Sequence, residues 1–376
     1  MAPLKIAVNT RLLLSDKMEG IGWFTYETMK RIAAAHPEVS FHFLFDRPFD
    51  DSFIFSENIK GHFLGPPARH SSLQKIWNNY SVPLILSKIK PDLYLSPDAQ
   101  LSMRARVKQH IVIHDINFEH YPKDIPNHYY QYLHKYTPLF IKKAARIATV
   151  SAFSRTDIAN RYNVDANLID IVPNGVNDSF RPLNKAETSV AKARYAKACD
   201  YFIAVGSIHP RKNLQRLLPA FDQFKSRNPS NTKLLLVGNE MFLTTEVKEA
   251  MKHLKHKKDV IFAGRLGAND LSMAIGAAIA NVYISYFEGF GIPVLEGFKC
   301  GVPVIAANAT SIPEVAGNAA HLVDPFDIND ISNALQKVHN DKLYREELIK
   351  RGFKQVQKFS WENTAQLLWQ SMMKAL

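Results

Sequence analysis

Residues 287–296, with the sequence FEGFGIPVLE, decide the expected fold. They follow a β-branched and aromatic run at residues 281–285 that is typical of a buried strand. Pro293 suits the start of a helix, where a missing N–H costs nothing, and Gly289 and Gly291 let the backbone approach a ligand closely. A strand, a glycine loop and a helix N-terminus together form an anion site, because free N–H groups and the helix dipole both favour negative charge.

Two carboxylates, Glu288 and Glu296, bracket this loop. A carboxylate accepts hydrogen bonds from hydroxyl groups, so the loop suits a ligand that carries both phosphate and sugar. In the alternative interpretation, Glu296 in a first helical turn complements the dipole, worth about 0.3–1 kcal/mol, and Glu288 is a solvated loop residue. The local pattern leaves both interpretations open.

The length and composition indicate a two-domain globular protein. The chain has 376 residues, of which 46% are hydrophobic and 22% charged. No apolar run approaches the ~20 residues that span a bilayer, and no signal-peptide pattern precedes the first expected strand. Cys199 and Cys300 form neither a disulfide framework nor a metal-ligand spacing. We therefore expect a cytoplasmic protein without a metal site.

The net charge of +12 indicates attraction to polyanions such as nucleic acid, anionic lipid or phosphorylated small molecules. The charges are spread along the chain and no nucleic-acid-binding module is recognisable, so we expect no nucleic-acid partner. Residues 129–146 form a helix-like segment rich in tyrosine and lysine. Such a helix can lie peripherally on an anionic membrane surface, but packing of its aromatics on a sheet is the favoured interpretation.

Strands and helices alternate in the first half of the chain. A strand at Lys5–Asn9, a loop with Gly20 and Gly22, and a helical pattern resemble the start of a Rossmann-like unit. In the alternative interpretation these glycines serve only the turn. A later strand ends at His114, where open α/β sheets bind ligands. Asp115 could orient this ring and fix its tautomer, although a lone histidine is often structural.

The composition changes at residues 178–198, which are polar and lysine-rich and are expected to belong to neither core. We place the domain boundary there. Residues 1–180 together with 360–376 form the first expected domain, and residues 181–359 form the second.

The second half repeats the order of strand, turn and helix. Gly206 follows a strand at residues 202–205, and Arg211 and Lys212 precede a helix. Adjacent cations beside a helix N-terminus are unfavourable for the dipole, which suggests that an anion compensates them. Diphosphate is the natural candidate, because Arg binds it as a planar fork and Lys as a point charge. The alternative is a pair of exposed loop cations.

Together these features resemble glycosyltransferase family 4, whose members are retaining transferases. The most specific match is the pair Glu288 and Glu296, eight residues apart within FEGFGIPVLEG. Further matches lie at residues 149–154, 172–176, 206–213, 300–305, 313–315, 323–325 and 359–362. The resemblance covers nearly the whole chain. It implies the α/β GT-B fold, in which two Rossmann-like domains face a central cleft and a C-terminal helix crosses back to the N-terminal domain.

The resemblance also implies residue roles. Arg211 and Lys212 would hold the diphosphate and stabilise the departing nucleoside diphosphate. Glu296 would bind the ribose hydroxyls, Glu288 would contact the donor sugar, and His114 would approach that sugar from the opposite domain. The remaining expected contacts, through backbone or loop, are at Gly20, Gly22, Gly206, Arg265, Leu266, Gly289, Phe290, Gly291 and Ile292. The family commonly has a double glycine where this chain has Gly-Ile-Gly, a variant of mannosyltransferase-like members, so the acceptor side is left open.

The implied reaction moves a hexosyl unit from GDP-mannose or a UDP-sugar to a hydroxyl of a glycan or lipid-linked acceptor, without a metal. No cofactor is expected, because the nucleoside-diphosphate sugar is a co-substrate. Two alternatives are a sugar-nucleotide epimerase of similar fold and a non-catalytic sugar-nucleotide-binding or scaffold protein. An anionic membrane at the cytoplasmic face is kept as a candidate partner. The sequence specifies neither the base, the sugar nor the acceptor.

Overall fold

The computed structural model describes residues 3–15, 17–239 and 245–376. The chain divides into two compact units, Met1–Gly175 with Ser360–Leu376, and Val176–Phe359. The boundary expected from the sequence, after residue 180, lies five residues beyond the first crossing between these units. Residues 1, 2 and 16 of the first expected domain and 240–244 of the second lie outside the described residues.

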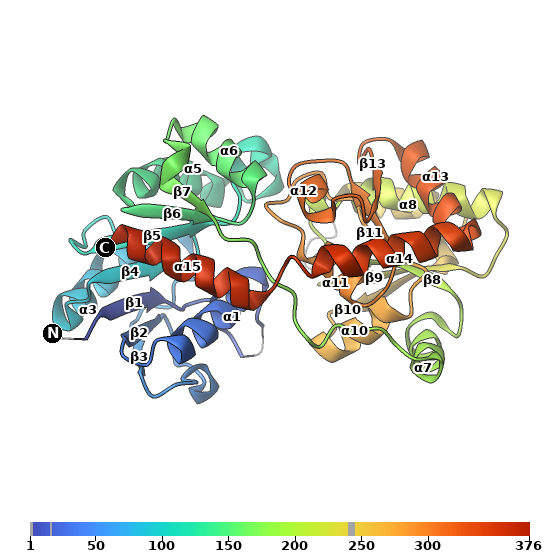
Figure 1. The fold of residues 1–376 in the computed structure, drawn as a ribbon. Helices are drawn as coiled ribbons and strands as arrows, with labels where there is room; N and C mark the ends of the chain where they lie inside the picture. The colour runs from blue at the N-terminus through green and yellow to red at the C-terminus, as the bar shows by residue number, and fades with distance from the viewer. Residues whose placement is uncertain (1–2, 16, 240–244) are drawn as a thin grey trace. The chain divides into compact units, whose positions relative to one another are not determined.

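The first unit contains a seven-stranded sheet in the order β3-β2-β1-β4-β5-β6-β7. Every adjacent pair is parallel, and the order reverses direction between β1 and β4 (Figure 1). The strands are β1 Lys5–Asn9, β2 Ser40–Phe45, β3 Ile59–Phe63, β4 Leu93–Ser96, β5 Lys108–Ile113, β6 Arg146–Thr149 and β7 Ile169–Ile171. The sequence did not reveal β3, because it is a short edge strand interrupted by Gly61.

Helices cover the first sheet, and the C-terminal helix is one of them. The helices are α1 Gly20–Ala35, α2 Ser71–Ile76, α3 Val82–Ile89, α4 Asn117–His120, α5 Asn127–Lys143, α6 Ala152–Tyr162 and α15 Trp361–Ala375. α15 lies beside α1 and across β4, β5 and β6 (Figure 1). A side chain at Gly175 would clash with the Trp361 backbone, so the chain at Gly175 packs closely against the start of α15. The expected return of the C-terminal helix to the first unit is confirmed.

Asp170 on β7 anchors α15 through charge. Its carboxylate accepts hydrogen bonds from Ser371 Oγ and from Lys374 Nζ, both on α15 and both at 2.7 Å. Arg146 on β6 binds the same carboxylate as a fork, with Nε at 2.7 Å and a terminal nitrogen at 2.9 Å. Burial opposes ionisation of Asp170, but these donors outweigh it and hold its pKa below the ordinary range.

We expect Asp170→Asn to lower the free energy of unfolding by about 1.5–3 kcal/mol, the range for hydrogen bonds to a charged group. Because the native pKa is depressed, this stabilisation is full above the unfolded carboxyl pKa of roughly 3.9 and is lost as the pH falls below it. Thermal unfolding between pH 8 and 3, with hydrogen exchange of α15, measures both effects. Glu57→Gln removes an exposed carboxylate of the same unit and should change nothing. Equal stability of D170N and wild type at pH 7 would contradict the role of Asp170 in anchoring α15.

The second unit contains a six-stranded parallel sheet in the order β10-β9-β8-β11-β12-β13. The strands are β8 Tyr201–Val205, β9 Lys233–Val237, β10 Val260–Gly264, β11 Ala280–Tyr283, β12 Val304–Ala307 and β13 His321–Val323. Its order also reverses at the centre, here between β8 and β11. Each unit is therefore a doubly wound α/β sheet, and the expected fold class is confirmed.

Helices also cover the second sheet. They are α7 Lys185–Ala196, α8 Leu214–Arg227, α9 Thr245–His253, α10 Ala268–Gly276, α11 Ile292–Lys299, α12 Ile312–Ala316, α13 Ile328–Asn340 and α14 Lys342–Val356. Phe202, Phe221 and Leu335 are fully buried where β8, α8 and α13 pack together. In the described ranges, no helix combines the length and the apolar character needed to cross a lipid bilayer.

Helix α7 corrects one expectation. Residues 178–198 were expected to belong to neither core, because their composition is polar and rich in lysine. Instead Asn184 and Glu187 form a capping box at the start of α7, and the helix packs on α10. Tyr195 is buried and donates a hydrogen bond to Asp270 of α10 at 3.0 Å. The polar residues are the solvent face of an amphipathic helix of the second unit.

Candidate functional site

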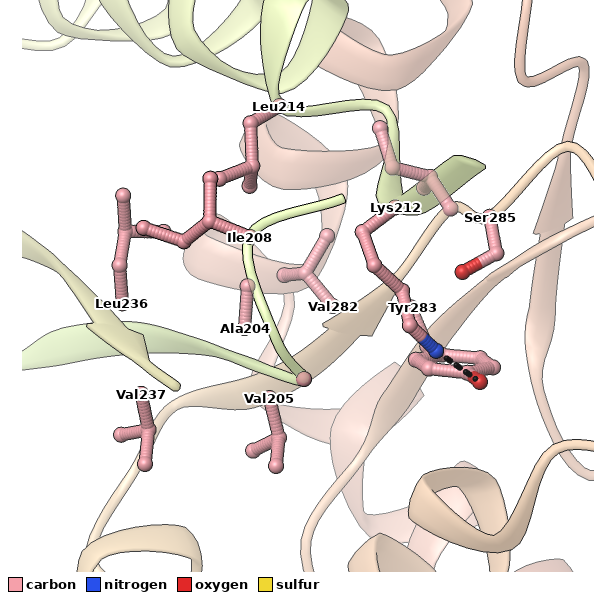
Figure 2. A pocket seen from close by; sticks show the side chains of 12 residues that line it. Ala204, Val205, Ile208, Lys212, Leu214, Leu236, Val237, Val282, Tyr283 and Ser285 are labelled. Atoms are coloured by element: carbon pink, nitrogen blue, oxygen red, sulfur yellow. Dashed lines mark hydrogen bonds between the residues drawn. The ribbon is translucent and has the colours of Figure 1, made fainter. Parts of the chain in front are cut away.

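The second unit brings several predicted site residues together at the carboxyl edge of its sheet. Ligands bind open α/β sheets where the strand order reverses, which here is between β8 and β11. Gly206 follows β8, Glu288 lies in the loop after β11, and Arg211 and Lys212 form a short turn before α8. Figure 2 shows the pocket at this edge, where the Lys212 side chain reaches Tyr283.

Glu288 pairs with both cations. Its carboxylate accepts a hydrogen bond from Lys212 Nζ at 2.6 Å and forms an ion pair with the Arg211 guanidinium. Lys212 Nζ also donates to the Tyr283 hydroxyl at 2.9 Å (Figure 2) and lies 4.7 Å from the centre of that ring. Within this trio two cations face one carboxylate, an arrangement that suits an anionic ligand. The expected compensating anion is thus partly internal.

The loop after β11 holds Glu288 rigidly. Only 6% of the residue is exposed, so the alternative of a solvated loop residue is wrong. Its backbone N–H donates to Thr310 Oγ1 at 3.1 Å, and its carbonyl oxygen accepts from Ser311 Oγ at 2.8 Å. Burial opposes ionisation, but Arg211 and Lys212 outweigh it and lower the pKa of Glu288 to about 2. The carboxylate is therefore charged at neutral pH.

A side chain would be strained at two glycines of the site. Gly206 has φ +145°, and a Cβ atom there would lie 2.9 Å from Lys212 Cε. Gly291 has φ +109°, and a Cβ atom there would lie 2.5 Å from the Ile312 side chain. Both residues adopt a backbone conformation that other residues rarely tolerate. The backbone at Gly206 therefore passes close to the lysine, and Gly291 turns the chain into α11.

The other members of the glycine loop lie beside this turn. Gly289 and Phe290 are buried, and the Phe290 ring packs edge-on against Phe359 with centroids 5.6 Å apart. Ile292 is half-buried and begins α11. The loop that carries Glu288 is thus fixed by packing on both sides.

Glu296 lies in the second turn of α11, as the fifth residue of Ile292–Lys299. It is therefore not a first-turn partner of the helix dipole, and that alternative is wrong. Burial raises the pKa of Glu296 to about 7, although Lys212 opposes the shift. Near neutral pH this carboxyl group is divided between its protonated and ionised forms.

In the first unit, His114 follows β5 and is half-buried. Its Nε2 lies 2.9 Å from the Pro97 carbonyl oxygen and must donate, whereas Asp115 accepts from the Asn117 N–H at 3.1 Å. The Pro97 carbonyl, not Asp115 as expected, therefore fixes the tautomer. Burial lowers the pKa of His114, and the Phe24 ring packs edge-on with centroids 5.0 Å apart. The imidazole is neutral at pH 7, with Nδ1 as its acceptor atom.

The two glycines near the start of the first unit differ in their surroundings. Gly20 begins α1, and a Cβ atom there would meet nothing within 4 Å. A Cβ atom at Gly22 would lie 2.6 Å from the Leu12 carbonyl oxygen. Packing thus requires a glycine at position 22, which agrees with the structural alternative there, whereas position 20 is open.

Arg265 and Leu266 lie apart from the cation cluster. They follow Gly264 at the end of β10, and β9 separates β10 from β8 in the sheet. Arg265 is exposed and Leu266 half-buried. Across the described part of the chain, no group of three or more His, Cys, Asp or Glu side chains is arranged to hold a metal ion.

Asn213 is a site residue to which the sequence analysis gave no role. It is fully buried with φ +64°, and its Nδ2 donates to the carbonyl oxygens of Ile284 at 3.1 Å and Pro325 at 2.6 Å. It thereby ties the cation turn to the loops after β11 and β13. An asparagine directly before a helical pattern is a recognisable signal, because Asn tolerates the left-handed conformation. Tyr283, Thr310 and Ser311 were also missed, because only the fold brings them to Lys212 and Glu288.

Comparison with known proteins covers both units. Residues 18–180 match the family model Glycosyltransferase Family 4, and residues 187–355 match Glycosyl transferases group 1. The O-antigen chain mannosyltransferase B of Escherichia coli is 29% identical over 357 residues, which span 92% of this chain and 93% of that protein. The O-antigen chain mannosyltransferase RfbU of Salmonella typhimurium is 28% identical over 69% of this chain and 68% of that protein.

Solved structures share the fold. Sucrose-phosphate synthase from Thermosynechococcus elongatus superposes with a TM-score of 0.80 at 20% identity and covers 98% of each chain. Anabaena HepE in complex with UDP-glucose superposes with a TM-score of 0.76 at 17% identity, over 98% of this chain and 99% of that one. At these identities the likeness concerns the fold alone.

Proposed function

Because this chain belongs to glycosyltransferase family 4, whose members are transferases of the GT-B fold, we propose that it is a retaining hexosyltransferase that uses a nucleoside-diphosphate sugar. GDP-mannose is the first candidate donor, since the two curated relatives described above are named mannosyltransferases. A UDP-sugar is the second, since HepE was solved with UDP-glucose. The proposed acceptor is a hydroxyl group of a glycan or of a lipid-linked glycan.

One observation carries this proposal: the cluster of Arg211, Lys212 and Glu288 at the edge between β8 and β11. A departing diphosphate gains negative charge as its bond to the sugar breaks, and fixed cations stabilise that charge where water is excluded. Arg211 and Lys212 would take this role. They would supply the charge that a divalent cation supplies in other enzymes, so the reaction would need no metal.

The other residues would position the donor. Glu288 would accept hydrogen bonds from sugar hydroxyls, and Glu296 from the ribose hydroxyls. The acceptor hydroxyl would attack the anomeric carbon on the face that the diphosphate leaves, while a donor phosphate oxygen accepts its proton. The Nδ1 atom of His114, as an acceptor, suits a sugar hydroxyl in the same reaction. Gly206 and the Gly289–Gly291 backbone would approach the phosphates closely.

Nucleotide binding tests the donor class first. Thermal shift and calorimetry against GDP, UDP, ADP and their hexose conjugates should show one preferred base. Transfer from the matching sugar nucleotide to a lipid-linked glycan, in EDTA, with NMR of the new anomeric centre, then tests acceptor, metal independence and retention. Isomerised donor without acceptor would favour the epimerase, binding without turnover would favour the scaffold alternative, and no binding would contradict the proposal.

Glu296 should make donor affinity depend on pH. Its pKa is about 7 in the free protein, and ribose hydroxyls bind the ionised form, so binding should release a proton. We therefore expect affinity to rise about tenfold per pH unit below pH 7 and to level off above it. The ligand should be an intact sugar nucleotide, because its diphosphate does not titrate in this range. Calorimetry between pH 5.5 and 8.5 measures the affinity.

Glu296→Gln is the matched variant for this prediction. It should bind the donor more weakly at pH 8 and with little dependence on pH. Turnover at saturating donor should change less than affinity, because the group binds the nucleotide rather than the reacting atoms. If donor affinity depends on pH in E296Q as it does in the wild type, Glu296 is not the ribose-binding carboxylate.

A further inference from the structure

One face of the first unit exposes apolar side chains in a regular row. Ile76, Tyr80 and Leu84 are 44%, 51% and 65% exposed. They recur every four residues along one helical run formed by α2, the π-helical turn Trp77–Ser81 and α3. Side chains at this spacing share one helix face. We call these three residues the apolar stripe.

The helical run packs apolar side chains into the core through its inward face. The stripe is therefore a second apolar surface of the same run. Trp77 and Val82 are fully buried and Leu86 is 5% exposed, and they pack in a core cluster with Leu44 and Tyr94. The Trp77 indole N–H donates to the Leu64 carbonyl oxygen at 2.8 Å. Core packing therefore fixes the inner face of the helical run, and the apolar stripe faces away from the core of the unit.

Cations flank the stripe. Lys88 follows Leu84 at the same spacing of four residues and is exposed. The Arg104 guanidinium lies 4.1 Å from the centre of the Tyr80 ring. On the side toward α5, Lys75 Nζ lies 5.4 Å from the centre of the Tyr136 ring. Long basic side chains thus border the stripe.

Two neighbouring segments extend this basic face. Met103, in the loop that carries Arg104, donates its N–H to Asn79 Oδ1 at 3.0 Å, and its carbonyl oxygen accepts from Lys143 Nζ of α5 at 3.2 Å. Leu139 of α5 is 40% exposed. The helical run, the loop and α5 therefore form one continuous surface.

The charge on these segments has a single sign. Residues 58–91, 99–114 and 125–156 contain no Asp or Glu, so all 35 acidic residues of the chain lie elsewhere. The Lys and Arg side chains of these segments thus carry no acidic counterpart in the same stretches. An apolar row inside a basic surface is the combination that inserts into the headgroup region of an anionic bilayer.

We propose that the stripe and its flanking cations dock this protein on an anionic lipid bilayer. A second copy of the chain fits less well, because a symmetric contact would bring like charges together. The helix α5, where the sequence placed the membrane alternative, buries Tyr132 and Phe140 and contributes only its outer edge. The proposal does not depend on the transferase activity.

Vesicle binding by the full chain tests this surface. Co-sedimentation with phosphatidylcholine vesicles that contain 30% phosphatidylglycerol should give affinity at least tenfold above that for phosphatidylcholine alone, and salt should weaken it. I76N/Y80S/L84N should lose at least tenfold in affinity, as should K88E/R104E. The matched controls are V190N/L343N, which alters exposed apolar residues of the second unit, and K257E/K258E. These controls should bind as the wild type does.

A local reporter locates the contact. Leu84→Trp should add a fluorescence component that shifts to the blue with anionic vesicles and is quenched by brominated lipid, whereas Leu343→Trp should not respond. Wild-type binding by I76N/Y80S/L84N with unchanged thermal unfolding would overturn the proposal. So would the absence of binding to the anionic vesicles, and stripe-dependent self-association in sedimentation or stripe-dependent RNA binding would then identify another partner for this surface.

Discussion

Arg211→Ala with Lys212→Ala should lower turnover by about 10²–10³-fold or more, the range for removing a preorganised electrostatic partner of the transition state. Both side chains lie in one turn and converge on Glu288, so they act as a unit and their effects should not add. Donor affinity should also fall, since the cations hold the diphosphate before it departs. Steady-state kinetics with the donor identified by the binding screen measures both effects.

The double variant needs a control because Glu288 is the shared partner of both cations. Removing both cations leaves a buried carboxylate without its partners, which costs about 3–5 kcal/mol in comparable ion pairs. The triple variant R211A/K212A/E288Q removes that carboxylate charge, so it should regain stability, but its turnover should lie well below that of E288Q alone. K257A/K258A removes two adjacent exposed cations from another short turn and should behave as wild type. Near-normal turnover in the stable triple variant would exclude the leaving-group role.

The architecture was accessible from the sequence because its signals are local. Apolar runs at Lys5–Asn9, Ser40–Phe45 and Lys233–Val237 are strands as expected, since parallel strands are buried on both faces. β3 was not predicted from the sequence and the segment of α7 was expected to belong to neither core, and both errors have one reason. Each lies at an edge or surface, where tertiary contacts decide the structure and composition is a poor guide.

The candidate site was predictable to the level of motifs but not of contacts. The glycines and carboxylates of residues 287–296 marked the loop, but nothing local indicates that Glu288 pairs with a turn more than seventy residues earlier in the chain. The same limit applies to His114, whose partner proved to be the Pro97 carbonyl rather than the adjacent Asp115. Long-range partners depend on strand order, which a single sequence does not display.

Glu288→Gln should separate binding from transfer, because Glu288 both neutralises the cations and, by our proposal, holds the sugar. Loss of its charge makes the cluster more positive by one unit, so a nucleoside diphosphate should bind more tightly, by roughly tenfold for an electrostatic gain near 1.4 kcal/mol. Turnover should fall by about 10²-fold, because the donor sugar loses its carboxylate contact. Calorimetry with the preferred nucleoside diphosphate and steady-state kinetics measure the two effects.

The stability of E288Q adds a third readout. The free variant should unfold at a lower temperature than wild type, since Arg211 and Lys212 lose their buried partner. The nucleoside diphosphate should restore more of that loss than it adds to wild type, because its charge replaces the missing carboxylate. Glu249→Gln, which removes a carboxylate from the exposed pair with Lys252, should show neither effect. If E288Q binds the diphosphate no more tightly than wild type, Glu288 does not compete with the ligand for the cations, and the anion site lies elsewhere in the second unit.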